Sequence, residues 1–160
     1  MKTKRLGKLP VGEQDFEKIR TLGRLYVDKT EFIYKLLESG TYFFLSRPRR
    51  FGKSLFLSTL KAFYEGKREL FEGLAIARHE DVTWEKHPVL YIDLNVGNYD
   101  APEVLISKLN LFLCDMERIY GKYGDEVSLG DRFGGVIRRA CEQTGKKVVI
   151  LVDEYEKPLL

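Results

Sequence analysis

The segment Arg47-Pro48-Arg49-Arg50-Phe51-Gly52-Lys53-Ser54 contains the residue types that a phosphate-binding loop uses. Such a loop reads GxxxxGK[ST] and joins a strand to a helix. The chain has the end of this pattern, Gly52-Lys53-Ser54, but it has Arg47 in place of the first glycine. Glycine lets backbone amides approach phosphate oxygens, and amides that open a helix favour an anion. The segment therefore predicts that the chain binds the phosphates of ATP together with Mg²⁺.

The side chains that follow Gly52 are assigned separate roles. Lys53 supplies a positive charge to the outer phosphates and so joins the catalytic residues, whereas Ser54 offers a hydroxyl ligand to magnesium. The full set predicted to bind the nucleotide is Arg50, Phe51, Gly52, Lys53, Ser54 and Leu55. Two interpretations of Arg47 stay open: it distorts the loop, or Pro48 stiffens the loop so that the first glycine is not needed. The alternative to a phosphate site is an ordinary strand-to-helix turn that contains a glycine.

The apolar run at residues 148–152 ends in Asp153 and Glu154, as does the acidic strand that accompanies a phosphate-binding loop. Asp153 would hold magnesium through water, and Glu154 would polarise the attacking water as general base. Ligands of parallel sheets bind at the carboxyl ends of strands, where both motifs place their polar residues. Glutamate directly after aspartate favours a hydrolysing ATPase over small-molecule kinases and GTPases. The alternative is a strand that merely ends in charged residues.

The remaining polar residues give weaker signals. Arg49 and Arg50 could contact phosphate, a partner chain or nucleic acid, and a solvated basic loop is the alternative. Asp93 follows a second apolar run and is predicted to cap a turn rather than to line the crevice beside Asp153. Glu156 and Lys157 could contact the site or a neighbour, but a solvated turn is favoured. Neither histidine has a partner at a useful spacing, so no chemistry is assigned to them.

Composition narrows the class of protein. The 160 residues suit one domain, and a hydrophobic fraction of 44% excludes a disordered chain. The net charge of +3 does not by itself indicate a nucleic-acid partner. Cys114 and Cys141 lack the spacing of a zinc site, and two buried thiols fit a reducing cytosol. No apolar stretch follows the basic N-terminus and no aliphatic run could span a bilayer, so we expect a cytoplasmic protein without a membrane partner.

Hydrophobic spacing places these motifs on alternating helices and strands. Apolar residues at helical spacing predict helices at residues 16–22, 32–37, 54–64, 105–119 and 133–140. Apolar or aromatic runs between turn signals predict strands at residues 41–45, 89–94 and 146–152. Capping boxes are expected at Asp28/Glu31, Asp100/Glu103 and Ser128/Asp131. This alternation predicts an α/β fold, a P-loop NTPase with three α/β/α layers and a mainly parallel sheet.

Three segments resemble the predicted AAA-ATPase-like family of bacteria and archaea, and the resemblance covers nearly the whole chain. They are residues 26–30, 44–54 and 152–159. The arginine-rich loop without a first glycine looks like that family's own version of the motif. The resemblance implies an N-terminal helical lead-in at residues 1–40 and a P-loop ATPase core at residues 41–160, truncated after the acidic strand. Residues 27–30 are similar to the family's N-terminal signature and either help to hold the nucleotide base or only cap a helix.

The resemblance also implies that parts of the ATPase lie outside this chain. In that family the module is typically followed by a nuclease-like domain of the PD-(D/E)XK type, whose motif is not found here. The chain ends six residues after Glu154, before the sensor strand and arginine finger of such ATPases, so the sheet is expected to be incomplete. Unpaired strand edges invite self-association. An arginine finger contributes about 10³–10⁵ in rate, so we expect this fragment to bind ATP better than it hydrolyses it.

Three functions follow from these features. The first is an ATPase module whose hydrolysis drives a conformational step on a partner protein. The second is a nucleotide-dependent switch or scaffold without turnover. The third is a nucleic-acid-associated module that acts through the Arg49/Arg50 loop or a downstream domain. Glu154 favours the first function over the second, and the small net charge of +3 counts against the third.

Overall fold

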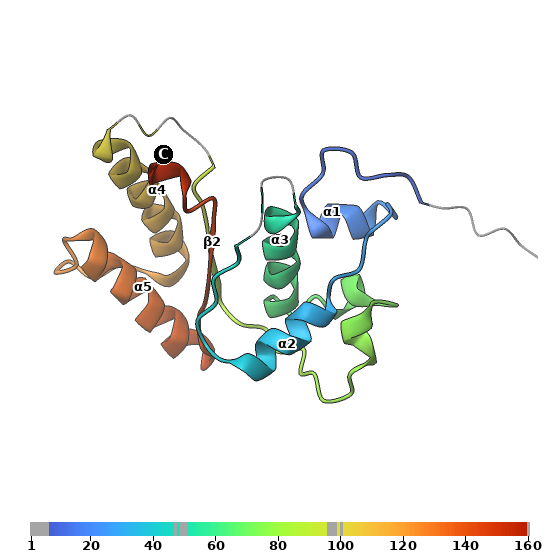
Figure 1. Cartoon of the computed structure of the whole chain (residues 1–160). Coiled ribbons are helices and arrows are strands. Elements are labelled where there is room, and N and C mark those ends of the chain that lie inside the picture. The colour runs from blue at the N-terminus through green and yellow to red at the C-terminus, as the bar shows by residue number, and fades with distance from the viewer. Residues whose placement is uncertain (1–6, 47, 49–50, 96–98, 100, 160) are drawn as a thin grey trace, which may run out of the picture. The chain divides into compact units, whose positions relative to one another are not determined.

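The computed structural model describes residues 7–46, 48, 51–95, 99 and 101–159. The chain divides into two compact units, residues 1–85 and residues 86–160. Figure 1 shows the helices and strands of both units. The boundary expected at residue 40, between a helical lead-in and an ATPase core, stays a prediction.

The first unit is helical over its described residues. Its elements are α1 (Phe16–Thr21), α2 (Glu31–Ser39), α3 (Lys53–Tyr64) and two short 3-10 helices, η1 (Arg68–Phe71) and η2 (Ala75–Arg78). The three α-helices confirm the helices predicted from apolar spacing at residues 16–22, 32–37 and 54–64. Asp15 is the N-cap of α1, and its side chain accepts a hydrogen bond from the Lys18 backbone amide at 3.1 Å. A cap of this kind satisfies one of the amides that open a helix.

Aromatic side chains form the core of the first unit. Phe16 is fully buried at the start of α1, and its ring centroid lies 4.8 Å from that of Phe71. The centroid of Trp84 lies 5.1 Å from the rings of both Phe63 and Phe71. Burying one such ring contributes about 1.5–3 kcal/mol to stability. This cluster therefore holds α1 and α3 against η1.

The carboxylate of Asp28 joins the start of α2 to η2. Its Oδ1 accepts hydrogen bonds from the Thr30 amide at 2.9 Å and the Thr30 hydroxyl at 2.7 Å, and its Oδ2 accepts one from the Ala75 amide at 2.7 Å. Partial burial alone would raise the pKa of Asp28, but these hydrogen bonds lower it below its ordinary value. The capping box predicted at Asp28/Glu31 is wrong, because the N-cap of α2 is Thr30 and has no side-chain cap bond.

Residues 41–45 do not form the strand that their aromatic run predicts. No strand is assigned to this described segment, and the side chains of Tyr42 and Phe44 are 96% and 71% exposed. Aromatic residues favour strands, but a strand also requires a hydrogen-bonded partner and a surface on which to pack. The two strands of the sheet in the described residues pair with each other, at positions far along the chain. The strand predicted at residues 41–45 is therefore wrong, because its high strand propensity does not by itself provide a strand to pair with.

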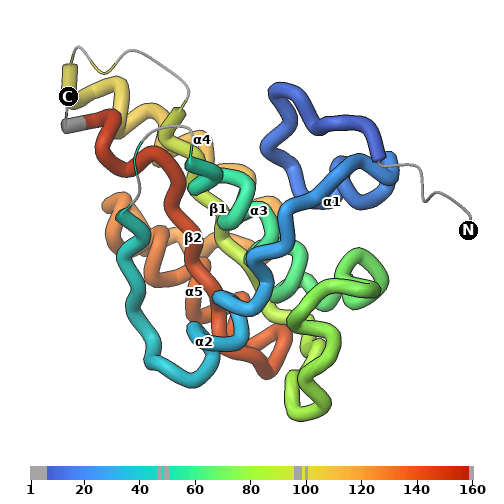
Figure 2. The backbone as a smooth tube through the Cα atoms, turned by 45° about the vertical axis from the view of Figure 1, so that its right-hand side comes forward, coloured from blue at the N-terminus to red at the C-terminus, as the bar shows by residue number. Residues whose placement is uncertain are grey.

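The second unit packs two helices on a small parallel sheet. Its elements are β1 (Val89–Asp93), α4 (Pro102–Tyr120), α5 (Leu129–Thr144), β2 (Val149–Asp153) and the short helix η3 (Lys157–Leu159). Strands β1 and β2 run side by side, with Val89 opposite Val149 and Asp93 opposite Asp153 (Figure 2). The predictions of strands at 89–94 and 146–152 and of the two long helices are confirmed, although β2 begins at residue 149.

One apolar cluster binds these elements together. Leu90 of β1, Leu113 of α4 and Val136 of α5 are its buried members, and seven partly buried side chains pack on them. The capping box predicted at Ser128/Asp131 is confirmed at the start of α5. The one predicted at Asp100/Glu103 does not begin α4: the N-cap is Ala101, which has no side-chain oxygen, and Asp100 lies outside the described residues.

Two buried ion pairs support α4 and α5. Arg132 of α5 donates from Nε to Glu117 Oε1 at 2.7 Å, and Arg139 donates to both oxygens of Glu126 at 2.5 and 3.0 Å. Gly135 makes room for the second pair, because a Cβ atom at this position would lie 1.8 Å from Glu126 Oε1. Arginine binds a carboxylate in this two-pronged way with defined geometry. The Arg132–Glu117 pair joins α5 to α4, and the Arg139–Glu126 pair fixes how the segment before α5 folds back on the helix.

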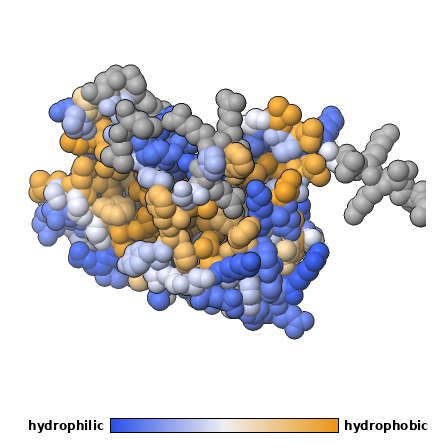
Figure 3. Space-filling view, viewed as in Figure 1, coloured by the Kyte–Doolittle hydropathy of each residue, from blue (hydrophilic) through white to orange (hydrophobic). Residues whose placement is uncertain are grey.

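The structure corrects the expectation that the two cysteines are buried. Cys114 and Cys141 lie in α4 and α5 as predicted, but both are exposed rather than buried, because each follows a core position on its helix. Figure 3 shows apolar surface on the side of the molecule where Figure 1, in the same view, labels α4 and α5, and Ile150 of β2 is 42% exposed. None of the helices formed by the described residues has the length and apolar character needed to cross a membrane.

The mixed helices and parallel strand pair are compatible with an α/β fold, and the three-layer arrangement stays a prediction.

Candidate functional site

Helix α3 begins directly after a glycine in the left-handed conformation. Gly52 is the N-cap, with φ 74° and ψ 30°, and its carbonyl accepts the first helical hydrogen bond from Phe56 at 3.0 Å. This left-handed conformation is unfavourable for residues that carry a Cβ atom, whereas glycine adopts it readily. A Cβ atom built on Gly52 would meet no atom of the described residues within 4 Å. Gly52 has no side chain, so the N-cap itself provides no side-chain acceptor to the opening amides of α3.

The residues predicted to bind phosphate surround this glycine. Lys53, Ser54 and Leu55 form the first turn of α3 and are half-buried, and Phe51 precedes Gly52 with a 62% exposed side chain. Arg50 lies outside the described residues, as do Arg47 and Arg49, so their assignments stay predictions. A helix that opens on glycine and carries a lysine and a serine in its first turn can bind an anion and offer a hydroxyl to a cation.

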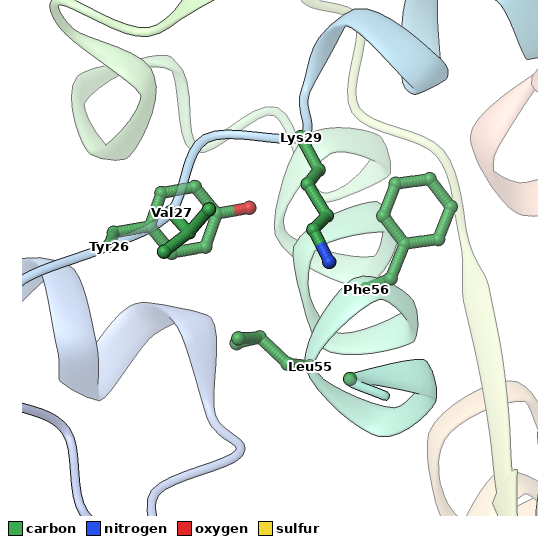
Figure 4. A pocket seen from close by; sticks show the side chains of 6 residues that line it. Tyr26, Val27, Lys29, Leu55 and Phe56 are labelled. Atoms are coloured by element: carbon green, nitrogen blue, oxygen red, sulfur yellow. The ribbon is translucent and has the colours of Figure 1, made fainter. Parts of the chain in front are cut away.

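The N-terminal signature segment lies beside this first turn. Tyr26, Val27 and Lys29 line a hollow of about 60 Å³ together with Gly52, Leu55 and Phe56. Figure 4 shows the Lys29 side chain running along the hollow toward the first turn of α3. Ligand pockets usually measure about 300–1,000 Å³, so this hollow is a notch that could hold only part of a nucleotide.

Tyr26 fixes one wall of the hollow. Its hydroxyl lies 3.3 Å from Thr59 Oγ1, and Thr59 in turn donates to the Leu55 carbonyl of α3 at 2.8 Å. Burial raises the pKa of the Tyr26 hydroxyl, which therefore stays neutral at physiological pH. The segment at residues 27–30, predicted either to hold a base or to cap a helix, thus contacts η2 through Asp28, and Tyr26 directly before it contacts α3.

The carboxyl end of β2 holds a buried carboxylate. Asp153 is 4% exposed, its Oδ2 accepts a hydrogen bond from the Tyr91 hydroxyl at 3.1 Å, and its Oδ1 accepts one from the Glu154 amide at 3.0 Å. Asp93, at the end of β1, is exposed and its Oδ1 accepts a hydrogen bond from the Asn95 amide at 2.8 Å. This contact confirms the prediction that Asp93 caps a turn.

Glu154 adopts an unusual backbone conformation directly after the strand. Its φ is 54°, and it is the one residue other than glycine with a positive φ among those that the structure describes. Such a conformation costs about 1–3 kcal/mol and persists where neighbouring contacts impose it. Here the Lys157 amide donates to the Glu154 carbonyl at 3.0 Å, which closes a turn over residues 154–157.

Lys157 connects that turn to the loop after β1. Its Nζ donates to Asn95 Oδ1 at 2.6 Å and lies 3.4 Å from the Asn95 carbonyl oxygen. The Leu94 amide also donates to the Asp153 carbonyl at 3.1 Å, so the two strand ends are held together beyond the ladder. Lys157 thus lies in the expected turn and also makes the contact that was the alternative to it, because a turn directly after β2 brings it beside the end of β1.

The Asp153 carboxylate fits a magnesium ion of the phosphate-loop type. A carboxylate has about four lone-pair positions, and the hydrogen bonds from Tyr91 and Glu154 occupy two of them. Within the described ranges, no three histidine, cysteine or acidic side chains gather closely enough to hold a metal ion by themselves. Magnesium is commonly held by one or two protein oxygens together with substrate phosphates and water, so this donor set suits it. The meeting of Asp153 with Lys53 and Ser54, which lie in the other unit, stays a prediction.

A glycine-capped helix with a Lys-Ser first turn and a parallel strand that ends in Asp-Glu are the local features from which the sequence predicts a phosphate-binding loop and its acidic strand. The chain belongs to the family described as Predicted AAA-ATPase, whose sequence model matches residues 10–160. It is also similar to a protein of Azotobacter chroococcum mcd 1 called "Uncharacterized protein in vnfD 5'region", with 45% identity over 155 residues. The match covers 96% of this chain but 30% of that protein. No solved structure matches the chain. Membership of this family indicates nucleotide binding in general terms.

Sequence reasoning missed the residues that support the acidic strand. Tyr91 donates a hydrogen bond to Asp153, and Lys157 donates one to Asn95. Each of these bonds joins residues that are 62 positions apart in the sequence. A signal for Tyr91 did exist, because alternate residues of a strand share a face and Tyr91 precedes Asp93 by two positions. No local pattern could have found the contact between Lys157 and Asn95.

Proposed function

We propose that this chain binds ATP with Mg²⁺ at the start of α3, and that the full-length protein hydrolyses the bound ATP. The observation that carries the proposal is Gly52 in a left-handed conformation immediately before Lys53 and Ser54. In this proposal the amides of the first turn and Lys53 bind the phosphates, and Ser54 binds the metal ion. Family membership supports the choice of ATP.

The acidic strand supplies the second half of the proposed chemistry. Asp153 holds the magnesium ion through water, and Glu154 accepts a proton from the attacking water. Two observations support these roles: Asp153 is 4% exposed with both oxygens hydrogen-bonded, and Glu154 has a strained backbone at the strand end. Strained residues cluster at active sites, where neighbouring structure holds them in place.

Thermal unfolding with added Mg-ATP tests the binding. Ligand at about 100 times its dissociation constant adds about 2.7 kcal/mol to stability, which corresponds to a rise of about 5–10 °C for a chain of this size. Lys53→Ala should abolish this rise. Lys18→Ala is the matched control, because Lys18 is an exposed lysine of α1 in the same unit. A folded wild-type protein whose unfolding temperature ignores Mg-ATP would refute the proposal.

Phosphate release by the full-length protein tests the hydrolysis. Glu154→Gln keeps the shape of the side chain but removes the base, so it should retain the Mg-ATP thermal shift and lose phosphate release. Equal release by both proteins would remove Glu154 from its role. Absence of release from the wild-type protein, with binding intact, would favour a nucleotide-dependent switch without turnover.

A further inference from the structure

Tyr91 and Asp153 lie on the same face of the β1–β2 sheet. Residues paired across a parallel ladder share a face, and so do alternate residues of one strand. Tyr91 is opposite Leu151 and Asp93 is opposite Asp153, so these four side chains project to one side. The Tyr91 ring reaches along this face to the strand end, where its hydroxyl donates to Asp153 Oδ2 at 3.1 Å.

The two oxygens of Asp153 are held by different groups. The Glu154 amide, which belongs to the backbone, holds Oδ1 at 3.0 Å. The Tyr91 hydroxyl holds Oδ2 from the neighbouring strand and is the side-chain donor of the pair. Together these bonds fix the rotation of the carboxylate about its side-chain torsions. Without the hydroxyl, one hydrogen bond would remain and the carboxylate plane could turn about it.

We infer that Tyr91 is a positioning residue for the magnesium ion, acting through Asp153; the inference rests on the proposed function. By holding Oδ2, Tyr91 directs the remaining lone pairs of the carboxylate toward the water shell of the cation. Partners that orient a metal-binding carboxylate in this way commonly change metal affinity about 10- to 100-fold when they are removed. Because Tyr91 does not touch the nucleotide in this proposal, its removal should leave metal-free nucleotide binding unchanged.

Equilibrium binding tests this inference without requiring turnover. The affinity of Mn²⁺, a paramagnetic substitute for Mg²⁺, is measured by electron paramagnetic resonance in the presence of a saturating non-hydrolysable ATP analogue. Nucleotide affinity is measured separately in EDTA. Tyr91→Phe removes only the hydroxyl and should weaken Mn²⁺ about 10-fold or more while nucleotide affinity in EDTA stays at the wild-type value.

Tyr99→Phe is the matched control. The Tyr99 hydroxyl donates to the Leu94 carbonyl at 2.9 Å, so this variant also loses one tyrosine hydrogen bond in the same unit, but not one to Asp153. It should bind Mn²⁺ like the wild type. Adding Tyr91→Phe to Asp153→Asn should cause no further loss, because residues that act through one another are not additive.

The remaining outcomes of these binding measurements distinguish failure of the inference from failure of the proposed function. Unchanged Mn²⁺ affinity in Tyr91→Phe overturns the inference and leaves the proposed function intact. Equal losses in Mn²⁺ and in metal-free nucleotide affinity also overturn it, because they indicate a general structural role. A wild-type protein that binds no nucleotide overturns the proposed function, and the inference with it.

Discussion

The left-handed backbone at Gly52 makes this position the most restrictive residue of the candidate site. Its φ of 74° suits glycine, and an alanine Cβ there would meet no atom within 4 Å in the part of the chain that the structure describes. The constraint is the conformation itself, together with the open space that a phosphate would need.

Gly52→Ala should therefore lower both stability and ligand binding. Alanine in the left-handed region costs about 1–2 kcal/mol, which urea denaturation can measure. The added methyl group also projects into the space in front of the helix start, so the Mg-ATP thermal shift should decrease by more than the lost stability accounts for. Gly124→Ala is a suitable comparison, because Gly124 has no close neighbour and no positive φ. Wild-type stability and binding in Gly52→Ala would contradict the assignment of the N-cap.

The hydrogen bonds to the Asp28 carboxylate should make the stability of the protein decrease at acidic pH. Its pKa is lowered in the folded protein by hydrogen bonds from Thr30 and Ala75, against the opposing effect of partial burial. A lowered folded pKa contributes stability that is present above the unfolded pKa of about 3.9 and is lost as the pH falls through the folded value. Asp28→Asn should therefore lower the unfolding temperature at pH 7 and converge with the wild type once the pH falls below the lowered pKa of Asp28 in the folded protein. A difference between the two proteins that is constant from pH 7 to pH 2 would exclude this linkage.

At the scale of elements, helix α5 offers a paired test of packing. Gly134 and Gly135 are neighbours in this helix, but a Cβ at Gly134 meets nothing within 4 Å, whereas one at Gly135 falls 1.8 Å from Glu126 Oε1. Gly134→Ala should raise stability by up to about 1 kcal/mol, because glycine is a poor helix former. Gly135→Ala should lower it, because the carboxylate must leave Arg139. Thermal unfolding of the two variants measures both signs, and a shift of the same sign in both would refute the packing of Glu126 on α5.

Local spacing predicted most helices and strands but not the contacts between them. The apolar stripes of α3 and α5 and the Ser128 cap are local patterns, and the structure confirms them. The strand expected at residues 41–45 failed because strand formation depends on a partner elsewhere in the chain. The hydrogen bond from the Ala75 amide to Asp28 was not predicted for a similar reason, since it joins groups 47 positions apart. The candidate site divides in the same way: the Gly-Lys-Ser turn is local, whereas Tyr91 and Lys157 act across 62 positions.

At the scale of the whole molecule, the proposed function requires groups from both compact units. Lys53 and Ser54 belong to residues 1–85, and Asp153 and Glu154 belong to residues 86–160. If one Mg-ATP engages both sets, binding at the start of α3 must also reduce the opening of the backbone around the end of β2. The ligand thus provides a test of the proposed site that does not depend on catalysis.

Hydrogen exchange of backbone amides can detect this coupling. In the wild-type protein, saturating Mg-ATP should slow exchange both at residues 51–56 and at residues 153–157, because a ligand held by both segments stabilises the closed form of each. Lys53→Ala should lose both effects together, whereas Lys18→Ala should keep both. Protection confined to residues 51–56 would show that ATP binds to the first unit alone, and it would remove Asp153 and Glu154 from the nucleotide site while leaving the phosphate-binding role of α3 in place.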